Sequence, residues 1–246
     1  MFNQHDFQIA LNQFKSTLDQ PFQLKSIFFD MDGVLFDSMP LHAKSWLQAF
    51  SEYGLNLPEY EPYMNEGSTA YYTVEQMFRK YLNREASPAI AEEIKNRKHD
   101  IMSTMPESAV MEHMPELLTE IALRDIDCWV VTGSAQARLY DRLNAVYNGS
   151  FKREKMITAH DVKNGKPDPE PYLAAIKKSG YGVHQAIVIE NAPLGVLSSK
   201  AAGLFTIAIN TGPLEPEVLT DAGADLVLSG SLELKNSWPM IYVNLI

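Results

Sequence analysis

Short apolar runs that end at polar residues recur along the chain, with segments of helical spacing between them. The runs lie at residues 27–29, 128–131, 187–189, 205–209 and 226–228, and the first four end at Asp30, Thr132, Glu190 and Asn210. Continuous apolar runs of this length are typical of strands that are buried on both faces. Because such strands alternate with helices, the sequence predicts an α/β fold: a Rossmann-like parallel sheet core with helices on both faces.

One segment breaks this alternation. Residues 40–110 show helical periodicity and no convincing strand, and the stripe of Val74, Met77 and Phe78 is typical of an amphipathic helix. We therefore predict an all-helical insertion at 40–110 in a core made of residues 25–39 and 111–246. Residues 1–24 carry apolar side chains at four- and three-residue steps, which predicts a helical extension packed on the core, with a dimer contact as the alternative.

Composition excludes several classes of partner. The chain has 246 residues and a net charge of -10, from 21 basic and 31 acidic residues, and its positive charges are scattered, which argues against a nucleic-acid partner. No apolar run approaches the ~18 residues that span a bilayer, so we expect no membrane partner. The single cysteine, Cys128, and an N-terminus without signal-peptide features predict a cytoplasmic protein. We expect a monomer.

Polar residues that suit phosphate chemistry follow the predicted strands. Ligands of open parallel sheets bind beyond the carboxyl ends of the strands. The residues at these ends, and in the loop before the strand predicted at 187–189, are Asp30, Asp32, Thr132, Gly133, Lys166, Glu190 and Asn191. Two adjacent carboxylates repel each other unless a cation shares them, which points to a hard ion such as Mg²⁺. A hydroxyl and backbone amides before a helix can seat phosphoryl oxygens, and a lysine can neutralise their charge.

Four segments resemble, in order and spacing, the motifs of the haloacid dehalogenase superfamily. These segments are DMDGVLFDS at 30–38, VVTGS at 130–134, GKPDP at 165–169 and IVIENAPLG at 187–195. The resemblance extends over residues 25–228 and points to the branch that contains β-phosphoglucomutases and sugar-phosphate phosphatases. It implies that the helical insertion is the cap domain of this family.

The resemblance also implies roles for individual residues. Asp30 would be the nucleophile that forms an aspartyl-phosphate, and Asp32 the general acid and base, whose backbone carbonyl binds Mg²⁺. Thr132, Gly133 and Lys166 would hold the phosphoryl group. The family usually has an aspartate ligand for Mg²⁺ where this chain has Asn191. We therefore expect weaker Mg²⁺ binding, or a larger share of the metal for Glu190.

The function that the resemblance implies is a Mg²⁺-dependent phosphatase acting on a small phosphorylated metabolite, with a sugar phosphate the favoured class. The alternative is a β-phosphoglucomutase, which His42 and Lys98 support because mutases of this branch use a histidine at the position of His42. The mutases also hold a second phosphate with an arginine, and the comparable segment at 66–71 has none. A minor alternative is a catalytically weak binding protein that keeps the fold, which only Asn191 supports.

Overall fold

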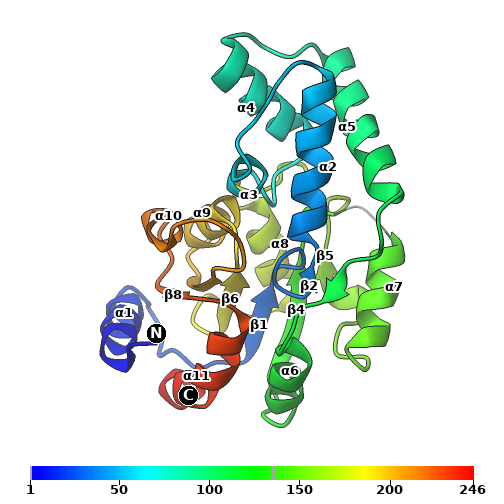
Figure 1. Cartoon of the computed structure of the whole chain (residues 1–246). Coiled ribbons are helices and arrows are strands. Elements are labelled where there is room, and N and C mark those ends of the chain that lie inside the picture. Colours follow the sequence, from blue (N-terminus) through cyan, green and yellow to red (C-terminus); the bar gives the residue numbers. More distant parts are fainter. Residues whose placement is uncertain (1, 135–136) are drawn as a thin grey trace.

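The computed structural model describes residues 2–134 and 137–246, and its centre is a six-stranded parallel sheet (Figure 1). The strand order is β5-β4-β1-β6-β7-β8. These strands are β1 (Ser26–Phe29), β4 (Asp127–Val131), β5 (Met156–Ile157), β6 (Ala186–Glu190), β7 (Phe205–Ile209) and β8 (Leu226–Leu228). In the middle of the sheet, Ile27 lies opposite Cys128 on one side and Ile187 on the other. The predicted α/β fold with a parallel sheet is confirmed.

Eleven helices are present in the part of the chain that the structure describes. They are α1 (Gln4–Ser16), α2 (Met39–Glu52), α3 (Glu61–Met64), α4 (Ala70–Leu82), α5 (Pro88–Ser103), α6 (Met114–Ala122), α7 (Ala137–Val146), α8 (Glu170–Ser179), α9 (Pro193–Ala201), α10 (Pro216–Asp221) and α11 (Ser231–Leu245), with a 3₁₀ turn at Arg153–Lys155. No helix among these is long and apolar enough to cross a membrane.

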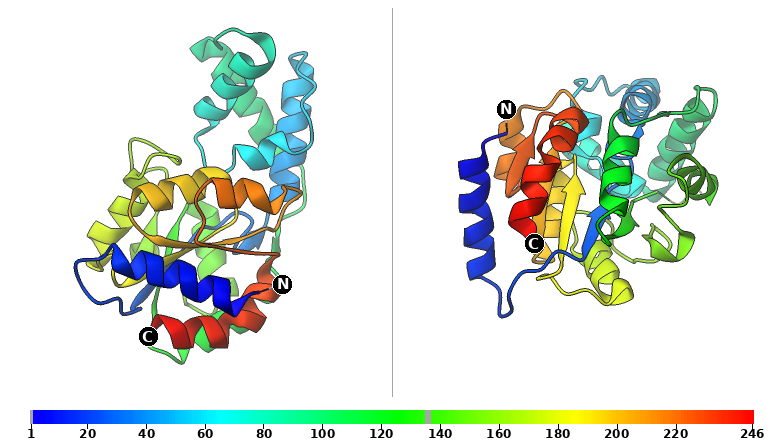
Figure 2. Two further views of the ribbon diagram at one scale, coloured as in Figure 1. Left: turned by 90° about the vertical axis from the view of Figure 1, so that its left-hand side faces the viewer. Right: turned by 90° about the horizontal axis from the view of Figure 1, so that it is seen from below.

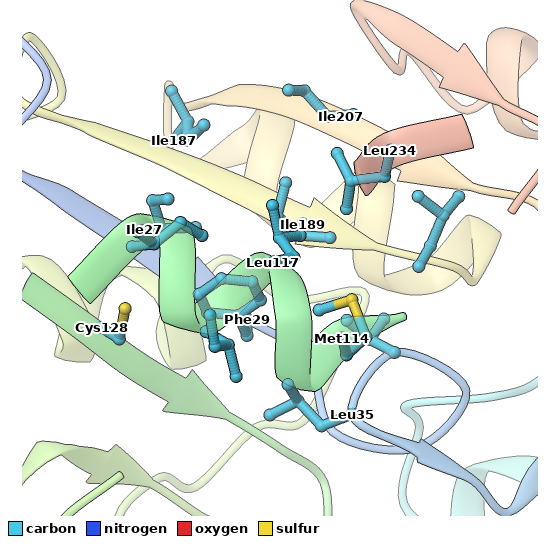
Figure 3. Close-up of a cluster of buried hydrophobic side chains, with 14 of the residues drawn as sticks. Ile27, Phe29, Leu35, Met114, Leu117, Cys128, Ile187, Ile189, Ile207 and Leu234 are labelled. Atoms are coloured by element: carbon cyan, nitrogen blue, oxygen red, sulfur yellow. The ribbon is translucent and has the colours of Figure 1, made fainter. Parts of the chain in front are cut away.

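Helices cover both faces of the sheet because the side chains of each strand alternate in direction. Ile27 and Phe29 point into a core that α1, α6, α7 and α11 complete, whereas Phe28 points to the opposite face, under α8 and α9. Figure 3 shows the first of these cores, where Met114 and Leu117 of α6 pack on the strands. Cys128 lies buried within it, and burial raises the pKa of its thiol to about 12.

The first helix contacts the sheet and the last helix. Phe7 and Phe14 of α1 are buried, and their rings meet the ring of Phe205 at centroid distances of 6.0 and 5.4 Å. Gln8 donates a hydrogen bond to Asn244 of α11 at 3.1 Å. Figure 2 shows α1 beside α11 at the side of the sheet. The apolar stripe of the N-terminal segment is therefore buried within the chain itself.

Helices α2 to α5 form a separate group above the core, at the top of Figure 1. They have their own apolar cluster, in which Trp46 and Phe50 of α2 pack with Phe78 of α4 and Ile94 of α5. Tyr81 and Leu82, in the last turn of α4, are exposed because the helix ends there and leaves this turn beyond the cluster.

Three short strands were not expected from the sequence. β2 (Phe36–Asp37) and β3 (Ala109–Val110) pair in antiparallel orientation, and together they join the helical insertion to the core. The expectation of a segment without strands is wrong at β3. β5 adds a sixth strand to the main sheet, with Met156 opposite Val130. Two-residue strands carry too little periodicity for sequence patterns to reveal them, and pairing with a neighbour defines them instead.

Candidate active site

The turn after β1 places two aspartates at the end of the central strand. Asp30 and Asp32 are only 3% and 5% exposed. The chain reverses at Gly33, whose φ of +87° favours glycine. A Cβ at Gly33 would lie 2.1 Å from Nδ2 of Asn191, so the absence of a side chain also lets the loop after β1 approach the loop after β6.

Lys166 connects the ends of three strands. Its Nζ donates to Oδ1 of Asp30 at 2.5 Å, to Oε1 of Glu190 at 2.6 Å and to the carbonyl of Val131 at 3.1 Å. Burial opposes the lysine's charge, but Asp30 and Glu190 raise its pKa well above the usual range. Burial, together with Glu190 and Asp32, also raises the pKa of Asp30 against the pull of Lys166. The structure thus brings the predicted polar residues together at one edge of the sheet.

Glu190 has no oxygen left without a hydrogen-bond partner. Its Oε1 accepts from Lys166 and, at 2.9 Å, from the hydroxyl of Tyr172, while Oε2 accepts from the backbone N–H groups of Asn191 and Ala192 at 2.9 and 3.2 Å. A Cβ at Gly195 would lie 1.8 Å from Oε1, so this carboxylate needs a glycine beside it. This geometry suits Glu190 to holding Lys166. Because both of its carboxylate oxygens already accept hydrogen bonds, Glu190 has little capacity to bind Mg²⁺, a role that the sequence analysis considered for it.

Two buried oxygens in this group have no hydrogen-bond partner, namely Oδ2 of Asp30 and Oδ1 of Asn191. Unpartnered buried oxygens are costly in proteins. In addition, the two carboxylates of Asp30 and Glu190 share a single ammonium group, which leaves an excess of negative charge. Both features fit a hard divalent cation, for which carboxylate, amide and carbonyl oxygens are suitable ligands. Among the described residues, no group of three or more His, Cys, Asp and Glu side chains is placed to hold a metal ion, so a cation here would also need the amide of Asn191 or a backbone carbonyl as a ligand.

Asp32 faces the helical insertion. Its Oδ1 accepts a hydrogen bond from Ser38 at 2.6 Å and lies 3.5 Å from Nε2 of His42, whose Nδ1 lies 3.2 Å from Nζ of Lys98. Burial favours the neutral form of Asp32, but His42 and Ser38 outweigh it and lower the pKa of this carboxyl. Lys98 is buried over the ring of Trp46, and burial lowers its pKa although Glu66 and Asp32 oppose the shift. His42 and Lys98 therefore form a chain of polar groups that leads to Asp32.

The phosphate-binding residues predicted from the sequence meet a loop of the insertion. Thr132 is buried, its Oγ1 accepts from the backbone N–H of Ser134 at 3.0 Å, and it lines a cavity of about 40 Å³ together with Gly133 and Lys166. A Cβ at Gly133 would lie 2.9 Å from the carbonyl oxygen of Gly67. The loop around Gly67 therefore lies directly against the end of β4.

Sequence reasoning did not single out Ser38 or Tyr172 as site residues. Ser38 is the residue directly before α2, and its hydroxyl reaches Asp32 because the chain turns back at Gly33. Tyr172 lies on α8, and its position in the sequence resembles that of any buried helix residue. The place of Ser38 as the last residue of the motif at 30–38 is the signal that could have marked it, whereas Tyr172 carries no such signal.

Fold and site together define an α/β enzyme with paired carboxylates and a buried lysine at the strand ends. The family model of haloacid dehalogenase-like hydrolases matches residues 27–209, and the chain belongs to this family. It is 28% identical over 231 residues to a validoxylamine A 7'-phosphate phosphatase of Streptomyces hygroscopicus subsp. limoneus, covering 88% of this chain and 98% of the relative. It is 29% identical to hexitol phosphatase A of Escherichia coli, covering 83% of this chain and 90% of that protein.

Solved structures agree with this assignment. A Bacteroides vulgatus protein that is provisionally assigned as a β-phosphoglucomutase superposes with a TM-score of 0.92 at 40% identity, and the match covers 99% of both chains. The family resemblance of the four sequence motifs is thereby confirmed, and the chain is a haloacid dehalogenase-like enzyme.

Proposed function

We propose that the chain is a Mg²⁺-dependent phosphatase that hydrolyses a monoester of a small hydroxylated metabolite, a sugar phosphate, through an aspartyl-phosphate on Asp30. The observation that carries the proposal is the environment of Asp30. Lys166 holds one of its oxygens, the other has no partner, and Asp32 lies two residues away at the same buried turn. By their names, the relatives described above are phosphatases of validoxylamine A 7'-phosphate and of hexitol phosphates, which supports a small hydroxylated phosphate ester as the substrate.

The first half of the reaction would transfer the phosphoryl group to Asp30. One carboxylate oxygen attacks phosphorus, the bond between phosphorus and the leaving-group oxygen breaks, and Asp32 gives its proton to that oxygen. A phosphoryl group next to Asp32 adds negative charge and raises the pKa of this carboxyl, so that it can carry a proton at this stage. Thr132, Gly133 and Lys166 would hold the phosphoryl oxygens.

The second half would return the enzyme to its starting state. Asp32, now ionised, accepts a proton from water, the water oxygen bonds to phosphorus, and the bond to Asp30 breaks to release inorganic phosphate. In this proposal Asp30, Asn191 and the backbone carbonyl of Asp32 hold the metal, and Glu190 holds Lys166. Mg²⁺ would neutralise charge on the phosphoryl group while it transfers.

We further propose that residues 40–110 act as the cap domain of this enzyme, over a core of residues 25–39 and 111–246 that residues 1–24 extend. The pairing of β2 with β3 at the two junctions and the separate apolar cluster of α2 to α5 support this division. A cap over Asp30 would exclude bulk water during the first transfer. We also propose that the enzyme works in the cytoplasm, which the single, buried cysteine supports because it can form no intrachain disulfide, and that it works as a monomer.

The proposal is tested by phosphate release from a panel of sugar phosphates, with and without Mg²⁺. We expect turnover that needs Mg²⁺, and a loss of about a thousandfold or more in Asp30→Asn because the amide cannot form the covalent intermediate. Asp221→Asn, an exposed change on α10, is the matched control and should keep the wild-type rate. Undiminished turnover in Asp30→Asn would refute the proposed nucleophile, and release from no ester would favour a binding protein.

A second candidate function is that of a β-phosphoglucomutase. The polar chain from Asp32 through His42 to Lys98 favours it, as does the likeness to the Bacteroides vulgatus structure. Incubation with β-glucose 1-phosphate, Mg²⁺ and a trace of the bisphosphate separates the two candidates. Glucose 6-phosphate as the product would identify a mutase, whereas inorganic phosphate supports the phosphatase.

A further inference from the structure

A cavity of about 340 Å³ opens beside Asp32, between the helical insertion and the core. Asp32 and His42 both line it. Its apolar lining includes Leu41 of α2, Met102 of α5, Leu139 of α7, and Met105, which follows α5. The volume falls within the ~300–1,000 Å³ that is usual for small-molecule sites in proteins. Because Asp32 is the proposed proton donor to the leaving group, the cavity lies where the organic part of an ester would leave.

The apolar side chains around this cavity are held in place by other parts of the protein. Leu139 is half-buried and packs against the main core under the sheet. Met102 is half-buried as well, and its Sδ accepts a hydrogen bond from Nζ of Lys98 at 3.4 Å. One wall thus belongs to α7 of the core and the other to α5 of the insertion. A ligand between them would contact apolar groups on two opposite sides.

Two further groups that line the cavity, Arg142 and His99, carry little free charge. Arg142 stacks on the ring of Phe36 at 4.5 Å, donates to the carbonyl and hydroxyl of Ser108, and lies 3.6 Å from Oε2 of Glu107. Its positive charge is therefore already compensated. Burial lowers the pKa of His99, and Lys98, Lys95 and His42 lower it further against Asp100, so that its imidazole is neutral near pH 7.

We propose that this cavity binds the leaving group of the substrate and selects a ring or chain of about six carbons. The leaving group would turn an apolar face to Met102 and Leu139 and its hydroxyl groups toward Arg142. It would carry no second anionic group. This inference rests on the proposed phosphatase function. Met102 and Leu139 are then specificity-determining residues, which contact the carbon skeleton and not the phosphoryl group.

Three esters that share the phosphate but differ in the leaving group test the inference. They are glycerol 3-phosphate, glucose 6-phosphate, and cyclohexylmethyl phosphate, which keeps the six-membered ring and lacks every hydroxyl. In wild type, we expect kcat/KM to be at least tenfold higher for both ring esters than for glycerol 3-phosphate. Leu139→Asn and Met102→Gln should each lower the ratio of cyclohexylmethyl phosphate to glycerol 3-phosphate about tenfold, since apolar contact is lost. Leu232→Asn, an exposed leucine on α11, is the matched control and should leave the ratio unchanged.

The outcomes separate this inference from the proposed function. If all three esters are hydrolysed equally well, or if both cavity variants lower every kcat/KM by the same factor, the inference is overturned while the phosphatase stands. If wild type hydrolyses none of them, the proposed function fails. The cavity is then tested by calorimetric titration of Asp30→Asn with the same esters, with and without Leu139→Asn. The inference is supported if the ring esters bind more tightly than glycerol 3-phosphate and if Leu139→Asn abolishes this difference in affinity. Equal affinity for all three esters would overturn it.

Discussion

At the scale of single residues, the uncharged metal ligand proposed at Asn191 gives the sharpest prediction. Its Oδ1 is buried without a partner, close to a group in which two carboxylates share one ammonium. Asn191→Asp adds a formal charge at that position, and we expect Mg²⁺ affinity to rise about tenfold, since part of the added attraction is offset by repulsion from Asp30 and Glu190. Calorimetric Mg²⁺ titration measures the change. An affinity that is the same in both proteins would mean that Asn191 does not contact the ion.

Gly195 is the second residue with a definite expectation. In the interior of α9, replacing glycine by alanine normally stabilises a helix by about 1 kcal/mol. Here the new Cβ would lie 1.8 Å from Oε1 of Glu190, so Gly195→Ala should lower the free energy of unfolding by about 1–3 kcal/mol instead. It should also lower kcat, because Glu190 can no longer hold Lys166. Urea denaturation decides the sign, and a stabilised variant would show that Glu190 has room elsewhere.

The sequence could identify the residues that lie directly at the ends of strands, because strand ends meet at one edge of a parallel sheet. Asp30 and Glu190 are such residues, and both contact Lys166, which lies in the loop before α8. It could not show that both oxygens of Glu190 would be occupied. That depends on Tyr172 and on two backbone N–H groups, whose directions are set by packing and not by residue type.

At the scale of elements, α1 is held by aromatic packing that can be measured. Phe7 is fully buried against Phe205, and removing such a ring typically costs about 3–5 kcal/mol. Phe7→Ala should therefore lower the free energy of unfolding by that amount. Ile9→Ala, on the exposed side of the same helix, should cost less than about 1 kcal/mol. Similar small losses in both variants, measured by urea denaturation, would mean that α1 does not pack on the sheet in solution.

The elements that the sequence revealed are those with several apolar residues in a row or at helical spacing. The run at 205–209 coincides with β7, and the stripe of Phe7, Leu11 and Phe14 lies within α1. The pattern failed for α11, where Pro239 lies inside the helix and apolar residues lie on more than one side. It also failed for β2 and β3, whose pairing brings together segments about seventy residues apart, a relation that no local pattern contains.

At the scale of the whole molecule, the helical insertion approaches loops of the core closely where these loops carry glycines. The carbonyl of Gly67 lies against Gly133, and the ring of Tyr63 in α3 lies against Gly212 in the loop after β7. That loop is tied to the turn after β1 by a hydrogen bond of 2.8 Å from the Thr211 hydroxyl to the carbonyl of Gly33. The sequence predicted two units but not these contacts, because each depends on a missing side chain that only the assembled structure explains.

The contact at Gly212 predicts a change in activity from a residue that does not touch the phosphate site. A Cβ at position 212 would lie 2.7 Å from Cδ1 of Tyr63, too close for the insertion to stay where it is. Gly212→Ala should therefore lower kcat/KM for a sugar phosphate about tenfold by displacing α3 and the loop that follows it. Tyr63→Ala removes the obstructing ring, so the double variant should lose no more activity than Tyr63→Ala alone. If the double variant instead shows the sum of the two single-variant losses in activation free energy, then the two residues do not contact each other during turnover. The insertion would then occupy a different position during turnover.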